Sequence, residues 1–252
     1  MAIKFARSVL AAAVGGAMLA ALAQPAYGLE FSKHSSNSAD VNAILAKGKI
    51  DDGDTYELKL YIASLPKKPN TVVYLDSPGG VLIEGLRLGR FFYEAKIETV
   101  VAAKTMCASA CALAFLGGRD NATGKSKRTK ATNGRLGFHS FSREFDTDRK
   151  YSADDLKYVV QKTQTEVYGI AEYLRDIKAD PDVLRIMLHA RADEMNFVSN
   201  DDAVTLGILI FDEKRTSVIQ PELVTRELNR RPAGEVPTPA LGPQVMRLQS
   251  AG

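Results

Sequence analysis

The sequence predicts an α/β fold in which a mostly parallel sheet is covered by helices, and two observations predict it. Between positions 41 and 118, short apolar segments rich in β-branched residues alternate three times with longer segments whose apolar residues have helical spacing. Turn-forming glycine, proline and aspartate residues separate these segments. Strands that alternate with helices are typical of β-α units, because a helical crossover is the usual way to join two parallel strands.

The three expected strand–helix pairs are 41–50 with 56–65, 71–76 with 81–94, and 99–103 with 110–116. The apolar, partly β-branched segment T-V-V-Y-L-D favours a buried strand. Asp54 closes the turn D-D-G-D and is the expected N-cap of the first helix. The turn S-P-G-G leads into the second helix, and Gly117 and Gly118 are expected to end the third.

The segment 119–135 differs from the chain before it. It contains six basic residues, one acidic residue, Asp120, and almost no apolar residues. We expect a solvated surface insertion, and the alternative is a basic rim that selects anionic substrates. The next short apolar strand is expected at 135–141 and contains His139.

The following part of the chain is mainly helical. Ser152 and Asp155 have the spacing of a capping box at the start of a long helix. The expected apolar stripe of this helix consists of Leu156, Val160, Thr163, Val167, Ile170, Leu174 and Ile177. Asp180 and Pro181 predict the start of a further helix that runs to about position 192. A helix at 201–206 is then expected between two short strands at 197–199 and 208–211.

Four regions are expected along the chain: a signal peptide at 1–28, a loosely held lead-in at 29–41, one domain at 42–224 and a disordered Pro-rich tail at 225–252. A basic start, an apolar run and small residues before Leu29 indicate a periplasmic or secreted protein. A retained membrane anchor is the alternative interpretation of the same run. The 33 basic and 30 acidic residues nearly balance, so no nucleic-acid partner is expected.

The segment C-A-S-A-C places Ser109 where an expected strand meets an expected helix. Serine is a favoured N-cap, so a structural role is one interpretation. A nucleophile is the other, because free N–H groups at a helix start, here chiefly that of Ala110, can stabilise an oxyanion. Cys107 and Cys111 flank the serine. In an exported protein they can form a disulfide, and otherwise they would pack as buried thiols.

Two distant features could act together with Ser109. S-P-G-G at 77–80 is either a plain tight turn or, at the end of a parallel strand, the source of a second oxyanion donor in the N–H of Gly80. His139 is either a core histidine bonded to a backbone carbonyl or a general base for Ser109. The sequence has no metal-binding or nucleotide-binding motif, so neither a metal nor a cofactor is expected.

Taken together, D-S-P-G-G at 76–80, A-S-A at 108–110 and G-F-H at 137–139 resemble the proteolytic subunit of the Clp protease, and more widely the ClpP/crotonase superfamily. The similarity runs from about 44 to 211 and includes G-K-I-D-D-G and F-V-S-N-D-D-A-V-T-L-G-I. With its signal peptide, the chain looks most like the bacterial periplasmic branch. The resemblance implies a ClpP/crotonase-like spiral of β-α units and a homo-oligomer.

The resemblance also implies a role for each matching residue. Ser109 becomes the nucleophile and His139 the general base. The N–H groups of Gly80 and Ala110 become the oxyanion hole.

One position departs from the pattern of the family. The third catalytic residue of Clp subunits is an acid just before the F-V-S segment, and Met195 stands there in this chain. Asp193, Glu194 or Asn196 could replace the acid after a small shift, or a Ser-His dyad could operate without one. An orienting group normally fixes the histidine tautomer, so its loss lowers the rate.

The expected function is therefore hydrolysis of peptide bonds in peptides or unfolded proteins by an exported serine peptidase. No ATPase partner is expected, because the periplasm lacks ATP. Two alternatives remain: a Ser-Lys peptidase, with Lys104 as a nearby candidate, and a catalytically inactive ClpP-like binding or scaffold protein. A crotonase-type acyl-CoA enzyme is not favoured, because acyl-CoA is cytosolic.

Overall fold

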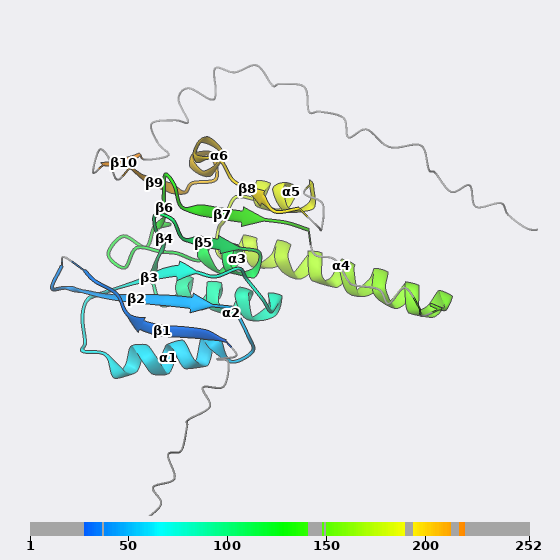
Figure 1. Ribbon diagram of the computed structural model, residues 1–252, viewed down its shortest axis with the longest axis horizontal. Coiled ribbons are helices and arrows are strands. Elements are labelled where there is room, and N and C mark those ends of the chain that lie inside the picture. The colour runs from blue at the N-terminus through cyan, green and yellow to red at the C-terminus, as the bar shows by residue number, and fades with distance from the viewer. Residues whose placement is uncertain are drawn as a thin grey trace, which may run out of the picture.

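The structure of the protein is a computed structural model that describes residues 28–36, 38–140, 148, 150–189, 194–212 and 217–219. Its strands form a seven-stranded sheet in the order β1-β2-β3-β4-β6-β9-β10 and a three-stranded sheet in the order β5-β7-β8 (Figure 1). The strands of the larger sheet are β1 (Leu29–Lys33), β2 (Val41–Gly48), β3 (Asn70–Asp76), β4 (Glu98–Val101), β6 (Arg128–Ala131), β9 (Leu209–Asp212) and β10 (Ser217–Ile219). The strands of the smaller sheet are β5 (Met106–Ala108), β7 (Arg135–Phe138) and β8 (Asn196–Phe197).

Six helices of the described residues connect or cover these strands: α1 (Asp54–Ser64), α2 (Leu82–Glu94), α3 (Ala110–Phe115), α4 (Ala153–Asp176), α5 (Asp182–His189) and α6 (Asn200–Thr205). The five inner strands of the larger sheet, from β2 to β9, pair in parallel. Only the outer strands β1 and β10 pair antiparallel with their neighbours. The predicted α/β class with a mostly parallel sheet is therefore confirmed, as are the first two predicted strand–helix pairs. In the third pair, the unpredicted strand β5 of the smaller sheet lies between β4 and α3.

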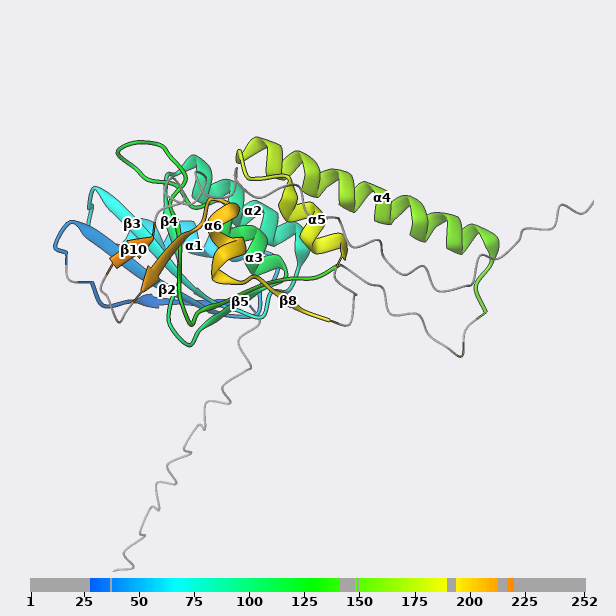
Figure 2. The same cartoon turned by 90° about the horizontal axis from the view of Figure 1, so that it is seen from above.

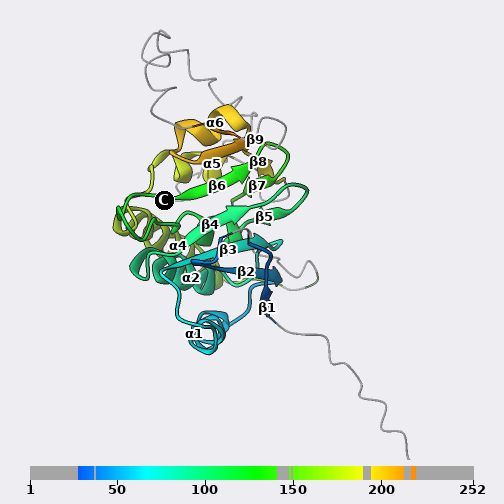
Figure 3. The ribbon, with the colours of Figure 1, turned by 90° about the vertical axis from the view of Figure 1, so that its left-hand side faces the viewer.

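Helix α3 is the most deeply enclosed element of the described fold. Its sequence A-C-A-L-A-F is apolar throughout, and all six residues are buried. Helix α2 packs closely against it, and a Cβ added at Gly85 of α2 would lie 2.9 Å from the Cβ of Ala110. Figure 3 shows α2 and α4 together on one side of the strands. Helix α2 therefore covers the start of α3 at close range.

The expectation of a solvated loop over 119–135 is wrong, because part of this segment forms strand β6. Strand β6 lies in the middle of the larger sheet, between β4 and β9. Arg128 and Lys130 are each only 3% exposed. Arg128 donates a 3.0 Å hydrogen bond to the carbonyl of Leu116, and Lys130 donates a 2.6 Å bond to Asn200 Oδ1. Burial lowers the pKa of Lys130, and it lowers that of Arg128 to about 10. The loop before β6 and a short turn after it are the parts outside the strand, and the two buried cations of β6 lie in the core and not on a basic rim.

Two expectations near the start of the chain are also wrong. The first residues of the lead-in form β1, which pairs with β2, because Leu29 is buried and Phe31 packs against the core. Gly53, not Asp54, is the N-cap of α1. The Asp54 carboxylate is buried and accepts hydrogen bonds from the N–H groups of Leu29 (3.0 Å) and Asp51 (2.8 Å). Desolvation raises its pKa. Asp54 therefore ties β1 to the start of α1.

Helix α4 begins with the predicted capping box, in which the Ser152 hydroxyl and the Asp155 carboxylate each accept a backbone N–H. Only the C-terminal half of its predicted apolar stripe packs against the domain, where Ile170 and Leu174 are buried. Leu156 is 51% and Val160 57% exposed, and this end of α4 projects from the domain in Figures 1 and 2. The helical spacing of the predicted stripe is confirmed. The stripe does not form one continuous core face, because its N-terminal residues are exposed.

The remaining predicted elements are confirmed within a few residues. Helix α5 is described as far as His189, and its predicted end near position 192 lies outside the described residues; β8, α6 and β9 follow in the predicted order. The expected tail lies wholly outside the described residues, as does the expected signal peptide except for Gly28. Among the helices of the described residues, none combines the length and apolar character that a membrane crossing requires.

Candidate active site

Ser109 lies at the junction of β5 and α3, in a backbone conformation that serine rarely adopts. Its φ is 57° and its ψ is −125°. Its N–H donates a 2.9 Å hydrogen bond to the carbonyl of Gly137 in β7, which fixes the turn to the neighbouring strand. A residue outside the common backbone regions costs of order 1–3 kcal/mol and persists only where its surroundings enforce it. Such a conformation needs a cause beyond the capping of a helix.

Two other serines in the same chain show what a capping serine looks like. Ser152 precedes α4 and Ser199 precedes α6, both with extended backbone angles. The side chain of each accepts the N–H three residues later. Ser109 holds the same position before α3, yet its side chain makes no cap hydrogen bond. The structure therefore does not support the N-cap interpretation of Ser109.

The Ser109 hydroxyl instead faces His139. The distance from His139 Nε2 to Ser109 Oγ is 2.8 Å. The two residues meet because β5 and β7 are parallel neighbours with Ala108 beside Gly137, and each side chain follows the end of its strand (Figure 1). A hydroxyl at this distance can transfer its proton to an unprotonated imidazole nitrogen, which is the geometry of an activated nucleophile.

The turn after β3 brings Gly80 to the same place. Backbone bonds between Ser77 and β5 hold this turn beside the strand before Ser109, and bonds of Ile50 with Gly79 and Val81 hold its other side. Gly79 has a φ of 98°, and an added Cβ would lie 2.7 Å from the Cβ of Ser109. The close approach of the two turns, as well as the positive φ, requires glycine here.

Gly80 and Ala110 both line the cavity that contains Ser109 and His139. Within the described residues, no hydrogen bond takes up the N–H of Gly80 or that of Ala110. Two such donors beside a nucleophile are what an oxyanion hole needs.

The cavity has a volume of about 210 Å³ and mostly apolar walls. Besides the four residues above, it is lined by Leu82, Leu113, Phe138 and Met187. The meeting of these four side chains could not be predicted from the sequence, because they come from α2, α3, β7 and α5. The only available signal was the apolar face of each element.

A disulfide joins Cys107 in β5 to Cys111 in α3, with the two Cα atoms 5.2 Å apart. Of the two states considered for these cysteines, the structure has the disulfide and not the free thiols. Both residues are fully buried. The closed loop is very short, so its entropic effect on the unfolded chain is small, about 2 kcal/mol from the loop-length relation.

Among the described residues, no side chain takes the place of the third catalytic residue that would orient His139. Met195 packs over Gly137, where its Sδ would lie 2.8 Å from an added Cβ. Asn196 pairs with Phe138 in the smaller sheet and is exposed, as is Glu194. No hydrogen bond of the described residues joins either side chain to His139, and Asp193 lies outside those residues.

Among the described residues, no hydrogen bond joins Lys104 to Ser109. Lys104 is exposed in the loop between β4 and β5. The Ser109 hydroxyl bonds to His139. This arrangement favours the Ser-His pair over the Ser-Lys alternative. In the described part of the chain, no group of three or more histidine, cysteine, aspartate or glutamate side chains is arranged to hold a metal ion.

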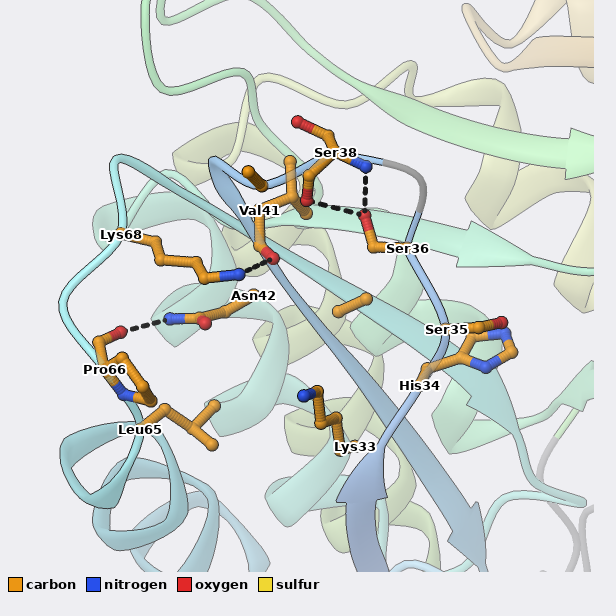
Figure 4. A pocket seen from close by; sticks show the side chains of 12 residues that line it. Lys33, His34, Ser35, Ser36, Ser38, Val41, Asn42, Leu65, Pro66 and Lys68 are labelled. Atoms are coloured by element: carbon orange, nitrogen blue, oxygen red, sulfur yellow. Dashed lines mark hydrogen bonds between the residues drawn. The ribbon is translucent and has the colours of Figure 1, made fainter.

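A larger cavity, of about 480 Å³, lies at the opposite, N-terminal end of β2 (Figure 4). The hydrogen bonds of its polar side chains go to the backbone: Ser36 bonds to the backbone of Ser38, and Lys68 donates a 3.0 Å bond to the carbonyl of Val41. His34 stands edge-on to Tyr74, with ring centroids 4.2 Å apart. Because no nucleophile is paired with this histidine among the described residues, the smaller cavity at Ser109 is the better candidate site.

No protein-family model matches the chain, and the search of curated proteins returned no match. The candidate site therefore stands on its own geometry: a serine outside its capping conformation, a histidine at 2.8 Å and an adjoining apolar cavity.

Proposed function

We propose that this protein is a serine hydrolase that cleaves peptide bonds, with Ser109 as nucleophile and His139 as general base. The observation that carries the proposal is the 2.8 Å contact of Ser109 Oγ with His139 Nε2. Ser109 makes this contact and no side-chain capping bond, whereas Ser152 and Ser199 each cap the helix that follows them. We further propose that the α/β fold is the spiral of the ClpP/crotonase superfamily, as the sequence resemblance implies.

The reaction follows from the positions of the groups. His139 Nε2 takes the hydroxyl proton while Oγ attacks the carbonyl carbon of the substrate. The negative charge that develops on the carbonyl oxygen is stabilised by the N–H groups of Gly80 and Ala110. His139 then returns the proton to the leaving amine, and an ester remains on Ser109. A water molecule, deprotonated by His139, hydrolyses this ester and restores the serine.

The cavity supports a preference for substrates with an apolar side chain beside the cleaved bond. Leu113, Phe138 and Met187 present an apolar surface next to Ser109. A volume of about 210 Å³ accommodates a side chain and not a folded domain. The substrate would therefore be a peptide or an unfolded segment, and this chemistry requires no metal, cofactor or ATPase partner.

A periplasmic or secreted location remains part of the proposal. The buried disulfide supports it, because stable disulfides are typical of oxidising compartments. A homo-oligomer is proposed as well, and the exposed Leu156 and Val160 on projecting α4 support it, since an apolar helix stripe is rarely left uncovered. Sedimentation of the purified protein tests this part independently of activity.

Incubation of the purified chain from Leu29 onward with a library of unstructured peptides tests the function. Mass spectrometry of the products should show cleavage next to apolar residues with wild type and none with Ser109→Ala. Equal cleavage by both proteins would assign the activity to a contaminant or another site. Absence of cleavage by either protein at high enzyme concentration would contradict the proposal.

The alternative is a catalytically inactive binding protein that keeps the fold. Met195, at the position where the resemblance implies an acid, favours it, because a histidine without an orienting partner is a weaker base. A fluorophosphonate probe separates the two functions, since it reports the reactivity of Ser109 whatever the substrate. A binding protein of this kind would bind peptides yet remain unlabelled.

A further inference from the structure

We propose that the Cys107–Cys111 disulfide is a positioning element that holds Ser109 in its reactive conformation, so that loss of the disulfide lowers the reactivity of Ser109 in a protein that is still folded. The inference rests on the proposed function, since it concerns the same nucleophile. It assigns to the two cysteines a role that neither their burial nor their small loop accounts for.

The disulfide brackets the Ser109 turn, residues 107–111. Cys107 belongs to β5, which is held on both sides: Cys107 lies beside Leu136 of β7 and forms a bridge with Ser77. Cys111 is the second residue of α3. The covalent bond therefore ties the first turn of the helix to a strand that is paired on both sides, and Ser109 lies midway between its two ends.

The turn has an alternative conformation that the same chain uses elsewhere. A serine before a helix ordinarily has extended backbone angles, and its hydroxyl accepts the N–H three residues later, as Ser152 and Ser199 do. In Ser109 the corresponding donor would be the N–H of Ala112. If the turn relaxed in this way, the hydroxyl would leave His139 for the helix backbone. Reactivity would then fall in proportion to the remaining population of the reactive turn.

The size of the effect follows from the conformational preference. The φ of 57° at Ser109 is left-handed and unfavourable for serine. The cost usual for such a residue corresponds to an equilibrium shift of about 5- to 150-fold toward the relaxed turn. The other contacts of the turn, including the bond from Ser109 N–H to Gly137, remain after the disulfide is lost and set where in this range the effect lies.

The test compares wild type with the double variant Cys107→Ala/Cys111→Ala. The measurements are the rate of fluorophosphonate labelling, the melting temperature, and kcat and KM for a small ester substrate. Leu58→Ala is the control, because Leu58 is fully buried in α1, outside residues 107–111, and its truncation destabilises the protein while both cysteines stay in place. Labelling should be about 5- to 150-fold slower in the double variant and unchanged in Leu58→Ala at a temperature where both are folded.

The kinetic constants separate positioning from general damage. The cavity walls Leu82, Phe138 and Met187 lie outside the turn, so KM for a small ester should stay near its wild-type value while kcat falls. If the double variant fails to fold, wild type is reduced with a phosphine below its melting temperature and the free thiols are counted by mass. Labelling should then fall as thiols appear and return on reoxidation.

The outcomes distinguish the two proposals. If oxidised wild type is not labelled, the proposed function fails and this inference fails with it. If wild type is labelled and the folded double variant, or the reduced protein, is labelled at the same rate, the proposed function stands and the disulfide has no positioning role. An equal loss of labelling in Leu58→Ala would also overturn the inference, because the effect would then come from reduced stability.

Discussion

Replacement of Gly79 by alanine is expected to disable Ser109 in a protein that remains folded. Gly79 has a φ of 98°, and its added Cβ would lie 2.7 Å from the Cβ of Ser109 and 2.6 Å from the carbonyl oxygen of Ala108. Carbon atoms pack at about 3.5–4.0 Å. The two turns must therefore separate by about 1 Å to admit the methyl group. A displacement of this size at a reacting group lowers the rate by about 100-fold.

Gly53→Ala is a matched control for this substitution. Gly53 has a φ of 99°, and nothing lies within 4 Å of its added Cβ. In both variants the left-handed backbone angle lowers the unfolding free energy by about 1–2 kcal/mol. Only Gly79→Ala lowers it further, by about 1–3 kcal/mol, through overpacking. The sum lies at or below the lower end of the stability of an ordinary domain, about 5–15 kcal/mol, so the variant should be folded at low temperature.

Urea unfolding and the rate of fluorophosphonate labelling measure the two effects separately. Gly53→Ala should lose about 1–2 kcal/mol of unfolding free energy and label as wild type does. Gly79→Ala should lose more and label about 100-fold more slowly. If folded Gly79→Ala labels at the rate of Gly53→Ala, the contact between the two turns does not position the serine, and the account of the site is wrong at this point.

Three further predictions concern stability. Tyr173→Phe removes the buried 2.6 Å bond from the Tyr173 hydroxyl to the carbonyl of Leu113 and should cost about 1 kcal/mol in urea unfolding without altering labelling; an unchanged unfolding midpoint would contradict this. Hydrogen bonds from Thr123 lower the pKa of Asp120 from 3.8 to about 2, so its carboxylate contributes stability that is present above about pH 4 and lost as the pH falls through about 2. The destabilisation caused by Asp120→Asn should therefore shrink between pH 6 and pH 2 in urea titrations, and a constant difference would refute the assignment. Ser152→Ala removes the capping box of α4, should cost about 1 kcal/mol, and should speed hydrogen exchange in the first turns of this projecting helix; unchanged exchange there would count against the cap.

Sequence reasoning located the groups of the candidate site because each lies at an element boundary with its own signal. Gly79 and Gly80 mark a turn, Ser109 marks a helix start, and His139 lies just after a short apolar strand. Ser109 and His139 meet because β5 and β7 are parallel neighbours in the smaller sheet, and a parallel bridge between Ser77 and Cys107 brings the turn after β3 beside them. The sequence could not show that Ser109 abandons its capping bond, because a capping serine and this serine look the same without backbone angles.

Two of the strands that the sequence did not predict, β6 and β1, share a physical cause. Strand β6 has the sequence R-T-K-A, whose two cations favour solvent unless they find buried acceptors. The acceptors are the Leu116 carbonyl and the Asn200 side chain, both distant in the sequence. Strand β1 reads as a polar lead-in because only Leu29 and Phe31 face the core, as suits an edge strand. Both strands depend on contacts with residues that are distant in the sequence, and the local composition of a segment does not show such contacts.

The central claim is that His139 activates Ser109, and the measurement that tests it most directly is fluorophosphonate labelling of wild type, Ser109→Ala and His139→Ala with intact-mass detection. One label per wild-type chain, none on Ser109→Ala, and labelling of His139→Ala slowed by about 10²- to 10⁴-fold is the predicted result. Labelling of His139→Ala at the wild-type rate would assign the base to another residue. Absence of labelling in folded, oxidised wild type would contradict the claim that Ser109 is a nucleophile.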